Sequence, residues 1–181
     1  MKKTPTLFKR NPEAMREILS KPNPVCDWVF NGEGVATRKY DGTCCLIDGG
    51  NFYKRRELKR GKPVPHNFVQ VDFDAATGKA VGWVPVDPEA AEDIWYMEAF
   101  SGDMPDGTYE LLGPKVQGNP EGFESHTLLK HSDAEQYPDV DRTFDGLRDF
   151  MENKDIEGLV FHHPDGRMAK IKKRDYGLRR T

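Results

Sequence analysis

The amino-acid sequence predicts an α+β fold in which antiparallel β-sheets are flanked by short helices. Short strand-like runs are separated by glycine-containing turns, as at 43–47 and 52–56. The elements do not alternate regularly between strand and helix, as they do in parallel sheets, and helical patterns are few. With 181 residues, the chain predicts a single domain over 1–181. Residues 1–33 form a possible small N-terminal lobe, and no separate C-terminal domain is expected.

Two helices are expected from their capping signals. The first spans 12–19, where Asn11 is a good N-cap and Pro12 suits the first helical position. The second spans about 144–153 behind the cap Thr143, with apolar side chains on one stripe. Strands are expected at 43–47, 52–56, 68–73, 82–86, 108–112, 158–161 and 167–173.

The composition indicates a polar but foldable protein, with 36% hydrophobic and 31% charged residues. No apolar run is long enough to span a bilayer, and the N-terminus does not resemble a secretory signal. The three cysteines, Cys26, Cys44 and Cys45, are an odd number, which predicts reduced thiols and a cytoplasmic location. A zinc site that joins these cysteines to His162 or His163 is not expected, because no CxxC spacing is present.

The charges are segregated along the chain. The net charge of −3 by itself disfavours a nucleic-acid partner. Two basic clusters, at 54–62 and 167–180, are separated by a segment, 87–157, that carries much of the acid. This distribution is compatible with one positive face for nucleic acid and equally with two solvated strand faces.

A small set of residues has an unusual order. Lys39-Tyr40-Asp41-Gly42 precedes a strand, Glu110 lies within a strand, and Glu157-Gly158 begins another. Lys170 and Lys172 are two residues apart and therefore share one face of their strand. Each pattern alone is ordinary, since a lysine before an Asp-Gly turn is usually a solvated surface residue. The order and spacing of the whole set carry the interpretation.

This ordered set resembles the motifs of the covalent nucleotidyltransferases, which include RNA ligases, DNA ligases and mRNA capping enzymes. Residues 39–42 match motif I (KxDG), and Glu110 matches the glutamate of motif III. Further matches are 53–57 to the basic motif Ia, 157–160 to motif IV and 170–172 to motif V (KxK). The resemblance runs from Ala36 to Lys172. The stretches 34–45, 107–120 and 170–178 are similar to small RNA ligases related to the T4 RNA ligases.

The resemblance implies a nucleotidyltransferase domain, of the ATP-grasp-like ligase adenylation type, that joins RNA ends. Lys39 would attack the α-phosphate of ATP, giving lysine–AMP and pyrophosphate. AMP would then pass to an RNA 5′-phosphate, and a 3′-hydroxyl would displace it. A free lysine has a pKa near ~10.4 and is a poor nucleophile, so neighbouring cations and partial burial are needed. Lys170, Lys172 and Arg55 are candidates for those cations.

The resemblance also implies binding roles. Glu110 would accept hydrogen bonds from the ribose hydroxyls, Lys172 would contact the α-phosphate, and Arg55 would reach a phosphate, whereas Arg56 points to the opposite face. Thr37 stands where many relatives hold a glutamate near the adenine. The expected ligands of Mg²⁺ or Mn²⁺ are Glu157 and Asp41, although Asp41 could equally cap its turn. Candidates for stacking on adenine are Phe123, His126 and His131, and none is preferred.

Several alternatives remain open. The chain could be a DNA ligase core, a capping-type enzyme that uses GTP, or a nucleic-acid-binding module that has lost transfer activity. Nicked duplex, single-stranded RNA and DNA are not distinguished as substrates, and no oligomeric state is predicted. Because the chain ends shortly after motif V, we expect a minimal ligase, help from the N-terminal lobe, or a partner that supplies a second domain.

Overall fold

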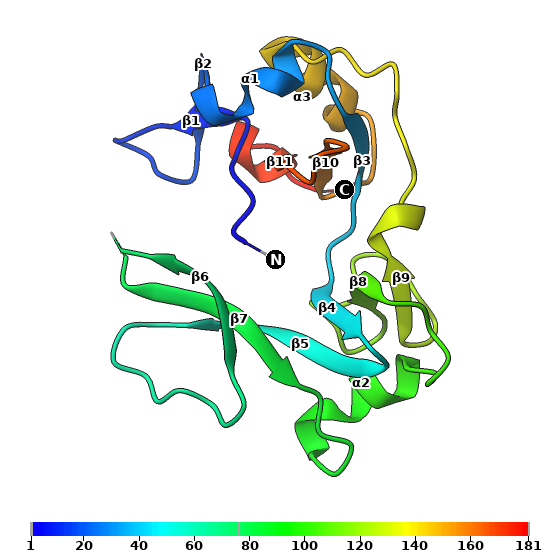
Figure 1. Cartoon of the computed structure of the whole chain (residues 1–181). Helices are drawn as coiled ribbons and strands as arrows, with labels where there is room; N and C mark the ends of the chain where they lie inside the picture. The colour runs from blue at the N-terminus through cyan, green and yellow to red at the C-terminus, as the bar shows by residue number, and fades with distance from the viewer. Residues whose placement is uncertain (1, 76, 181) are drawn as a thin grey trace. The chain divides into compact units, whose positions relative to one another are not determined.

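The computed structural model describes residues 2–75 and 77–180, and the chain divides into two compact units (Figure 1). Unit 1 comprises Asp41–Asp133 together with Lys2 and Lys3. Unit 2 comprises Thr4–Tyr40 and the segment from Ala134 to the end of the described chain. Residues 4–33 therefore belong to the same unit as the C-terminal segment, while the expected single domain over 1–181 stays a prediction.

Unit 1 is built on a six-stranded antiparallel sheet with the order β6-β7-β5-β4-β8-β9. Helix α2 (Ile94–Ala99) follows the 3-10 helix Ala91–Asp93, and a further 3-10 turn, His131–Asp133, follows the last strand. The strands are β4 (Thr43–Asp48), β5 (Asn51–Leu58), β6 (Val69–Asp74), β7 (Lys79–Pro85), β8 (Gly107–Leu112) and β9 (Thr127–Lys130).

The two faces of this sheet have different chemistry. On one face, buried residues such as Cys45, Phe52 and Tyr109 form a core against Tyr96 and Phe100 of the α2 region. The alternation of side chains along each strand places the neighbouring residues on the other face. That second face carries Arg55 and Glu110, two of the residues that the sequence pattern singled out.

Unit 2 contains a three-stranded antiparallel sheet, β11-β10-β3, and a small two-stranded sheet, β1-β2. The N-terminal segment joins the larger sheet through a parallel bridge between Thr6 and Lys170. The elements are β1 (Phe8–Arg10), β2 (Ile18–Pro22), β3 (Val35–Lys39), β10 (Gly158–His162), β11 (Met168–Lys172), α1 (Asp27–Phe30), α3 (Phe144–Glu152) and the 3-10 helices Pro24–Cys26 and Lys173–Tyr176.

The core of unit 2 lies between helix α3 and one face of its sheet. Leu147 and Met151 of α3 are buried with Leu159, Phe161 and Ile171. Because strand residues alternate, Lys39, Gly158 and Lys172 lie together on the opposite face. The packing of α3 thus fixes which face of the sheet can present polar groups.

The expected α+β class with antiparallel sheets is confirmed, since every pair of named strands is antiparallel. The expected strands are present with ends shifted by a few residues. The second helix is confirmed, and the Thr143 side chain caps it through the backbone N–H of Gly146 at 3.1 Å. Among the described helices, none is long and apolar enough to cross a membrane.

The predicted helix over 12–19 is wrong. Asn11 does cap a backbone N–H, that of Glu13 at 3.0 Å, but it caps a turn that joins β1 to β2. Ile18 and Phe8 are both buried in the core of unit 2, one on each strand of this hairpin. Burial of these two apolar side chains outweighs a local helix signal, whose worth is only about 1 kcal/mol.

Candidate functional site

The most concentrated polar arrangement in unit 2 is formed by Lys39, Glu157 and Lys172. Lys39 ends β3, Glu157 immediately precedes β10, and Lys172 ends β11. The register places Lys39 and Lys172 opposite Gly158 from its two sides. One carboxylate oxygen of Glu157 accepts from the Lys39 ammonium group and the other accepts from that of Lys172. Residues 133 positions apart are therefore held by one carboxylate.

All three side chains are largely buried, with 20%, 12% and 14% of the side chains of Lys39, Glu157 and Lys172 exposed. Burial by itself would raise the pKa of Glu157, but the two lysine ammonium groups outweigh it, so this pKa lies below its ordinary value. Burial, and then the positive charge of Lys39, lower the pKa of Lys172, although Glu157 opposes that shift. The arrangement therefore holds two cations close together around one anion.

Gly158 allows the strands to approach at this point. A Cβ atom on this residue would lie 2.1 Å from the carbonyl oxygen of Ile171 and 2.8 Å from the Cα atom of Lys172. Neither backbone atom can move without breaking the β10–β11 pairing. The glycine of the Glu-Gly pair is thus required by backbone contact, and this close approach brings Lys172 next to Glu157.

Thr37 and Lys170 lie on the same sheet face as Lys39. Both are paired with Val160 of the central strand, one from each side. The Thr37 hydroxyl donates to the carbonyl oxygen of Val160 at 3.2 Å and also lies 3.2 Å from Nε2 of His162. Since Thr37 is only 7% exposed, it is a buried polar residue held by neighbouring strands. The structure therefore places the predicted residues Thr37, Lys39, Lys170 and Lys172 on one face.

Glu110 is a buried polar residue on the face of the unit 1 sheet that points away from α2. It is 9% exposed and lies on β8, opposite Cys44 of β4. One of its oxygens accepts the backbone N–H of Gly42 at 3.1 Å, and the other lies 2.9 Å from Nε2 of His131. Strand alternation places Arg55 of β5 on this same face and Arg56 on the face toward α2, as predicted.

The approach between Gly42 and β8 is also too close for a side chain. A Cβ atom on Gly42 would lie 2.2 Å from the carbonyl oxygen of Leu111 and 2.8 Å from Cγ of Glu110. Asp41, which precedes it, donates its backbone N–H to the Glu121 carboxylate at 2.9 Å. The Asp-Gly pair therefore positions the chain against the strand that carries Glu110.

The Arg55 side chain has a buried hydrogen-bond donor with an unusual environment. Its Nε atom is buried, and within the described residues no hydrogen-bond partner is recorded for that atom. A buried donor without an acceptor costs about 1–3 kcal/mol, so such groups usually have a function. An anionic group bound on this face would satisfy it.

The three candidates for stacking on adenine lie in different surroundings, all in unit 1. Phe123 donates its backbone N–H to Asn119 in a loop. His126 is buried, stacks on Trp95 and contacts Glu98 of α2. His131 lies beside Glu110. Of the three, His131 is the one in direct contact with a predicted site residue.

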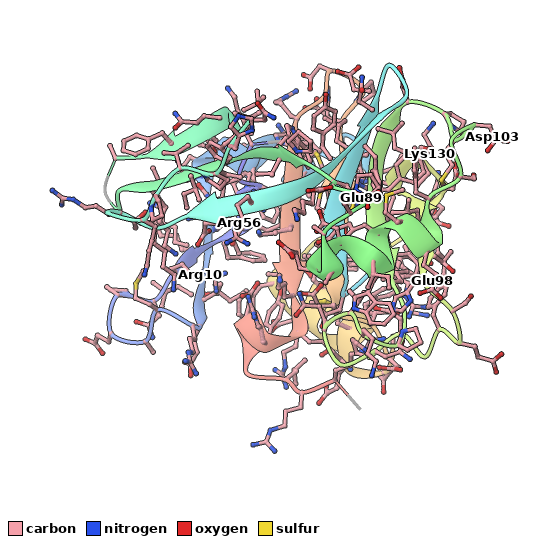
Figure 2. All side chains as sticks on the ribbon, turned by 90° about the horizontal axis from the view of Figure 1, so that it is seen from below. Arg10, Arg56, Glu89, Glu98, Asp103 and Lys130 are labelled. Carbon is pink, nitrogen blue, oxygen red and sulfur yellow. The ribbon has the colours of Figure 1, made fainter. Side chains whose placement is uncertain are left out.

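The two basic clusters are partly neutralised inside their own units. Lys54 forms an ion pair with buried Asp93, and Lys172 pairs with Glu157. Lys173 is buried and donates to the carbonyl oxygen of Lys154 at 2.7 Å. Arg56 remains exposed on β5, where Figure 2 labels it. The clusters therefore supply fewer free cations than their sequence suggests.

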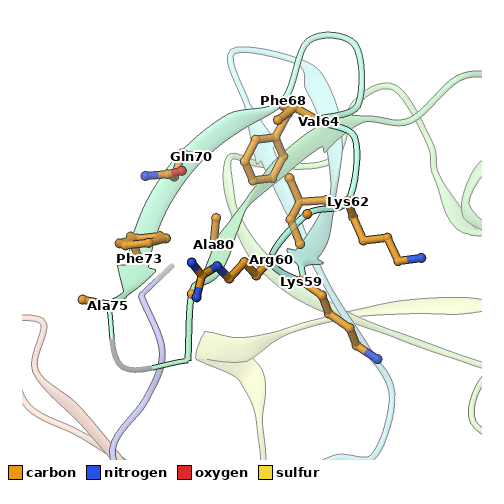
Figure 3. A pocket seen from close by; sticks show the side chains of 12 residues that line it. Lys59, Arg60, Lys62, Val64, Phe68, Gln70, Phe73, Ala75 and Ala80 are labelled. Carbon is orange, nitrogen blue, oxygen red and sulfur yellow. The ribbon is translucent and has the colours of Figure 1, made fainter.

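Three exposed cations of the first basic cluster lie in the loop after β5. Lys59, Arg60 and Lys62 line a pocket of about 500 Å³ together with Phe68 and Phe73 (Figure 3). This pocket lies at the β6 edge of the sheet. It combines cations with aromatic rings, a composition common in sites that bind single-stranded nucleic acid.

The predicted site residues are thus divided between the two units. Lys39, Thr37, Glu157, Lys170 and Lys172 belong to unit 2, whereas Asp41, Arg55 and Glu110 belong to unit 1. The boundary falls within the KxDG tetrapeptide, between Tyr40 and Asp41. The joint role of Glu157 and Asp41 as metal ligands stays a prediction, and both oxygens of Glu157 are engaged by lysines in this structure.

The sequence did not predict the contacts of three neighbours of the predicted residues. His162 contacts Thr37, while Cys44 and His131 lie beside Glu110. From the sequence, Cys44 and His162 were considered only in a zinc site that was not expected, and His131 only as a candidate for stacking on adenine. Their partners are far apart along the chain, so no local spacing could have joined them. Cys44 pairs with Glu110 across β4 and β8, but this pairing can be recognised only when the register of the two strands is known.

The chain is similar in sequence, over most of its length, to proteins named RNA ligase 1. The chain is similar to RNA ligase 1 from Rattus norvegicus, with 24% identity over 229 aligned residues that cover 83% of this chain and 69% of the relative. It is also similar to RNA ligase 1 from Mus musculus, at 23% identity, and from Danio rerio, at 22%; these alignments cover 83% and 80% of this chain and 68% of each relative. No protein-family model matches the chain.

Proposed function

We propose that the chain is an ATP-dependent 5′–3′ RNA ligase that works through a covalent lysine–AMP intermediate on Lys39. The observation that carries this proposal is the buried group of Lys39, Glu157 and Lys172 on one sheet face, in the order of the nucleotidyltransferase motifs. The similarity to proteins named RNA ligase 1 supports RNA as the substrate.

In the first step, Nζ of Lys39 attacks the α-phosphorus of ATP. An N–P bond forms, the bond from that phosphorus to the bridging oxygen breaks, and pyrophosphate leaves. The amine must lose a proton before it attacks, and Glu157 is the carboxylate in contact with it. Lys172, held on the same carboxylate, supplies positive charge for the negative charge that develops on the phosphate.

The later steps transfer AMP to RNA and then release it. An oxygen of the RNA 5′-phosphate attacks the AMP phosphorus and breaks the N–P bond, which returns the lysine. A 3′-hydroxyl then attacks the activated 5′-phosphate, forms the phosphodiester and displaces AMP. On the nucleotide, Glu110 would accept from the ribose hydroxyls and Arg55 would donate to a phosphate. Thr37 and Lys170, on the face that carries Lys39, are proposed as further nucleotide contacts.

A divalent ion belongs to this proposal as a cofactor. The carboxylates of Glu157 and Asp41 are hard oxygen donors of the type that Mg²⁺ and Mn²⁺ prefer. The ion would offset negative charge on the phosphates. In the structure Glu157 instead holds two ammonium groups, so its role toward the lysines can be tested without any metal.

The decisive experiment follows a radioactive label from ATP onto the protein. The purified chain is incubated with ATP labelled at the α-phosphate and Mg²⁺ or Mn²⁺, and the products are separated on a denaturing gel. We expect the wild type to retain label and Lys39→Ala to retain none. The matched control is Lys21→Ala, an exposed lysine of unit 2, which should label like the wild type. Label placed at the γ-phosphate should not be retained.

The same assay separates the alternatives. A wild type that takes no label from ATP or GTP would overturn lysine nucleotidylation and favour a nucleic-acid-binding module. Label taken from GTP alone would indicate capping-type chemistry. Sealing assays on nicked RNA, nicked DNA and single-stranded RNA would then define the strands that are joined, and sealing of DNA alone would contradict an RNA ligase.

A further inference from the structure

Cys44, Glu110 and His131 form a cluster of three different metal-ligand types on one face of unit 1. Cys44 lies on β4, Glu110 lies opposite it on β8, and His131 follows β9. The thiol sulfur, a carboxylate oxygen and an imidazole nitrogen all lie within 4.8 Å of one another. Among residues 2–75 and 77–180, no other group of three histidine, cysteine or acidic side chains lies close enough to bind one metal ion.

The ligand types select the class of metal. A thiolate is a soft donor and an imidazole is intermediate, so the set suits Zn²⁺ and related transition metals rather than Mg²⁺. Ligand atoms around a tetrahedral Zn²⁺ lie about 3.3–3.8 Å apart, given bond lengths of about 2.0–2.3 Å. The three atoms lie within 4.8 Å of one another, so small side-chain movements would bring them to that spacing. Three protein ligands would leave a fourth position open.

The surroundings hold the ligands in the required orientation. The Nδ1 atom of His131 lies 2.9 Å from the hydroxyl oxygen of Thr108, and its Nε2 atom lies 2.9 Å from the Glu110 carboxylate. The other Glu110 oxygen accepts the Gly42 N–H at 3.1 Å. Metal-binding histidines usually make such a hydrogen bond through the second nitrogen, which fixes the ring.

The contact between His131 and Glu110 can be made through a proton or through a metal ion. With the proton on Nε2, that N–H donates to Glu110 and Nδ1 accepts from the Thr108 hydroxyl. With the proton on Nδ1, that N–H donates to Thr108, and the lone pair of Nε2 can bind a metal ion beside the carboxylate. The side chains of Glu110 and His131 are only 12% and 21% exposed, so water would weakly screen the attraction between the carboxylate and a metal ion at this position. The Cys44 sulfur supplies the third donor for a metal at that position.

We propose that Zn²⁺ binds here through Cys44 Sγ, the Glu110 carboxylate and His131 Nε2, and that this binding inhibits nucleotide binding. The inhibition rests on the proposed function, in which Glu110 receives the ribose hydroxyls. A carboxylate bound to Zn²⁺ has fewer free lone pairs for those hydroxyls. The metal site itself rests only on the geometry of unit 1.

The metal site is tested first, with Co²⁺ as a spectroscopic probe and no nucleotide present. We expect one equivalent of Co²⁺ to give the near-ultraviolet charge-transfer band of a cobalt–thiolate bond, and Zn²⁺ to abolish it. Cys44→Ser should lose the band, whereas the control Cys26→Ala, in unit 2, should keep it. Thr108→Val should weaken Zn²⁺ binding about tenfold or more, because it removes the hydroxyl that hydrogen-bonds Nδ1 and orients the His131 ring. Circular dichroism confirms that each variant folds.

Two results would overturn the metal site. One is the absence of a cobalt–thiolate band in the wild type. The other is a band of undiminished intensity in folded Cys44→Ser, which would assign the thiolate to another cysteine. Neither result touches the labelling of Lys39 by ATP, so failure of the metal site is distinguishable from failure of the proposed function.

The inhibition is tested next, by Lys39 labelling with α-labelled ATP and a fixed excess of Mg²⁺. We expect Zn²⁺ at saturating concentration to reduce labelling at least tenfold in the wild type, with relief as ATP increases. Cys44→Ser should label without Zn²⁺ and resist its addition. Equal inhibition of wild type and Cys44→Ser would place the effect at another site and overturn the inhibition. A cobalt band without any labelling would leave the metal site standing and reject the ligase.

Discussion

At the scale of single residues, Glu157 explains how the ammonium groups of Lys39 and Lys172 can lie close together in a largely buried site. Lys39 and Lys172 would repel each other strongly without an anion between them. The carboxylate contacts both ammonium groups and is itself mostly buried. Its negative charge is therefore needed for the folded arrangement whether or not nucleotide is present.

We expect Glu157→Gln to lower the free energy of unfolding by about 3 kcal/mol near neutral pH, because it leaves two buried cations without their anion. The folded-state pKa of Glu157 lies below its ordinary value of 4.5. Its stabilising contribution is thus fully present above that ordinary value and is lost as the pH falls through the lower folded-state pKa. Urea unfolding at a series of pH values, with chelator present, measures this contribution.

The control for this pH dependence is Glu17→Gln, an exposed glutamate of unit 2. It should leave the stability profile close to that of the wild type. The Glu157→Gln profile should be flatter on the acid side, since the variant has lost the group that titrates there. A variant profile that falls as steeply with acid as the wild type would contradict the role assigned to Glu157.

The sequence predicted part of the arrangement of the site residues on their strands, while the chemical roles of these residues stay predictions. The lysine pair and Lys39 lie on one face, as their spacing and motif order suggested, and Arg55 shares a face with Glu110. Sequence reasoning could not foresee that Glu157 bridges the two lysines. That contact depends on the register of three strands, which is fixed by the burial of Leu159, Phe161 and Ile171.

At the scale of elements, local signals succeeded where the chain also buried an apolar stripe. The cap at Thr143 precedes a segment with Leu147 and Met151 on one face, and helix α3 forms there. The cap at Asn11 precedes a segment in which Ile18 is buried but Met15 and Leu19 are exposed, and the chain forms a turn and a β-hairpin. Strand β9 was missed because its four residues lie between turns and pair with β8 only across a loop.

We expect Thr143→Ala to destabilise unit 2 by about 1 kcal/mol, because the first turn of α3 then loses the acceptor for the Gly146 N–H. Thr143→Ser keeps a hydroxyl at the cap and should cost a few tenths of that amount. Thermal unfolding of the two variants beside the wild type measures the difference. Equal loss in both variants would show that the methyl group, not the cap, is responsible.

At the scale of the whole molecule, the two units each have a hydrophobic core of their own. The core of unit 2 contains Leu147 and that of unit 1 contains Leu111. The sequence did not predict this division, because the motifs run in one order along the chain and one of them crosses the boundary. Chain segments that are adjacent in the sequence at Tyr40 and Asp41 belong to different sheets, which only the pairing of strands reveals.

Because each unit has its own core, a change in one core should lower the free energy of unfolding of that unit alone. Leu147 and Leu111 are 0% and 1% exposed, so replacing either with alanine should cost about 2–5 kcal/mol in its own core. Hydrogen exchange followed by mass spectrometry should then show faster exchange of β10 and β11 amides in Leu147→Ala, with β4 and β8 unchanged. Leu111→Ala should show the reverse pattern.

The matched pair makes the comparison quantitative, since both changes remove the same atoms from equally buried positions. If the units unfold independently, the costs of the two changes should add within about 0.5 kcal/mol in the double variant, as they do for distant sites. Faster exchange in all four strands in both single variants would instead mean that the two cores unfold as one cooperative unit. In that case a change in the core of unit 2 would also weaken Zn²⁺ binding by Cys44, Glu110 and His131, which the cobalt spectrum of Leu147→Ala would reveal.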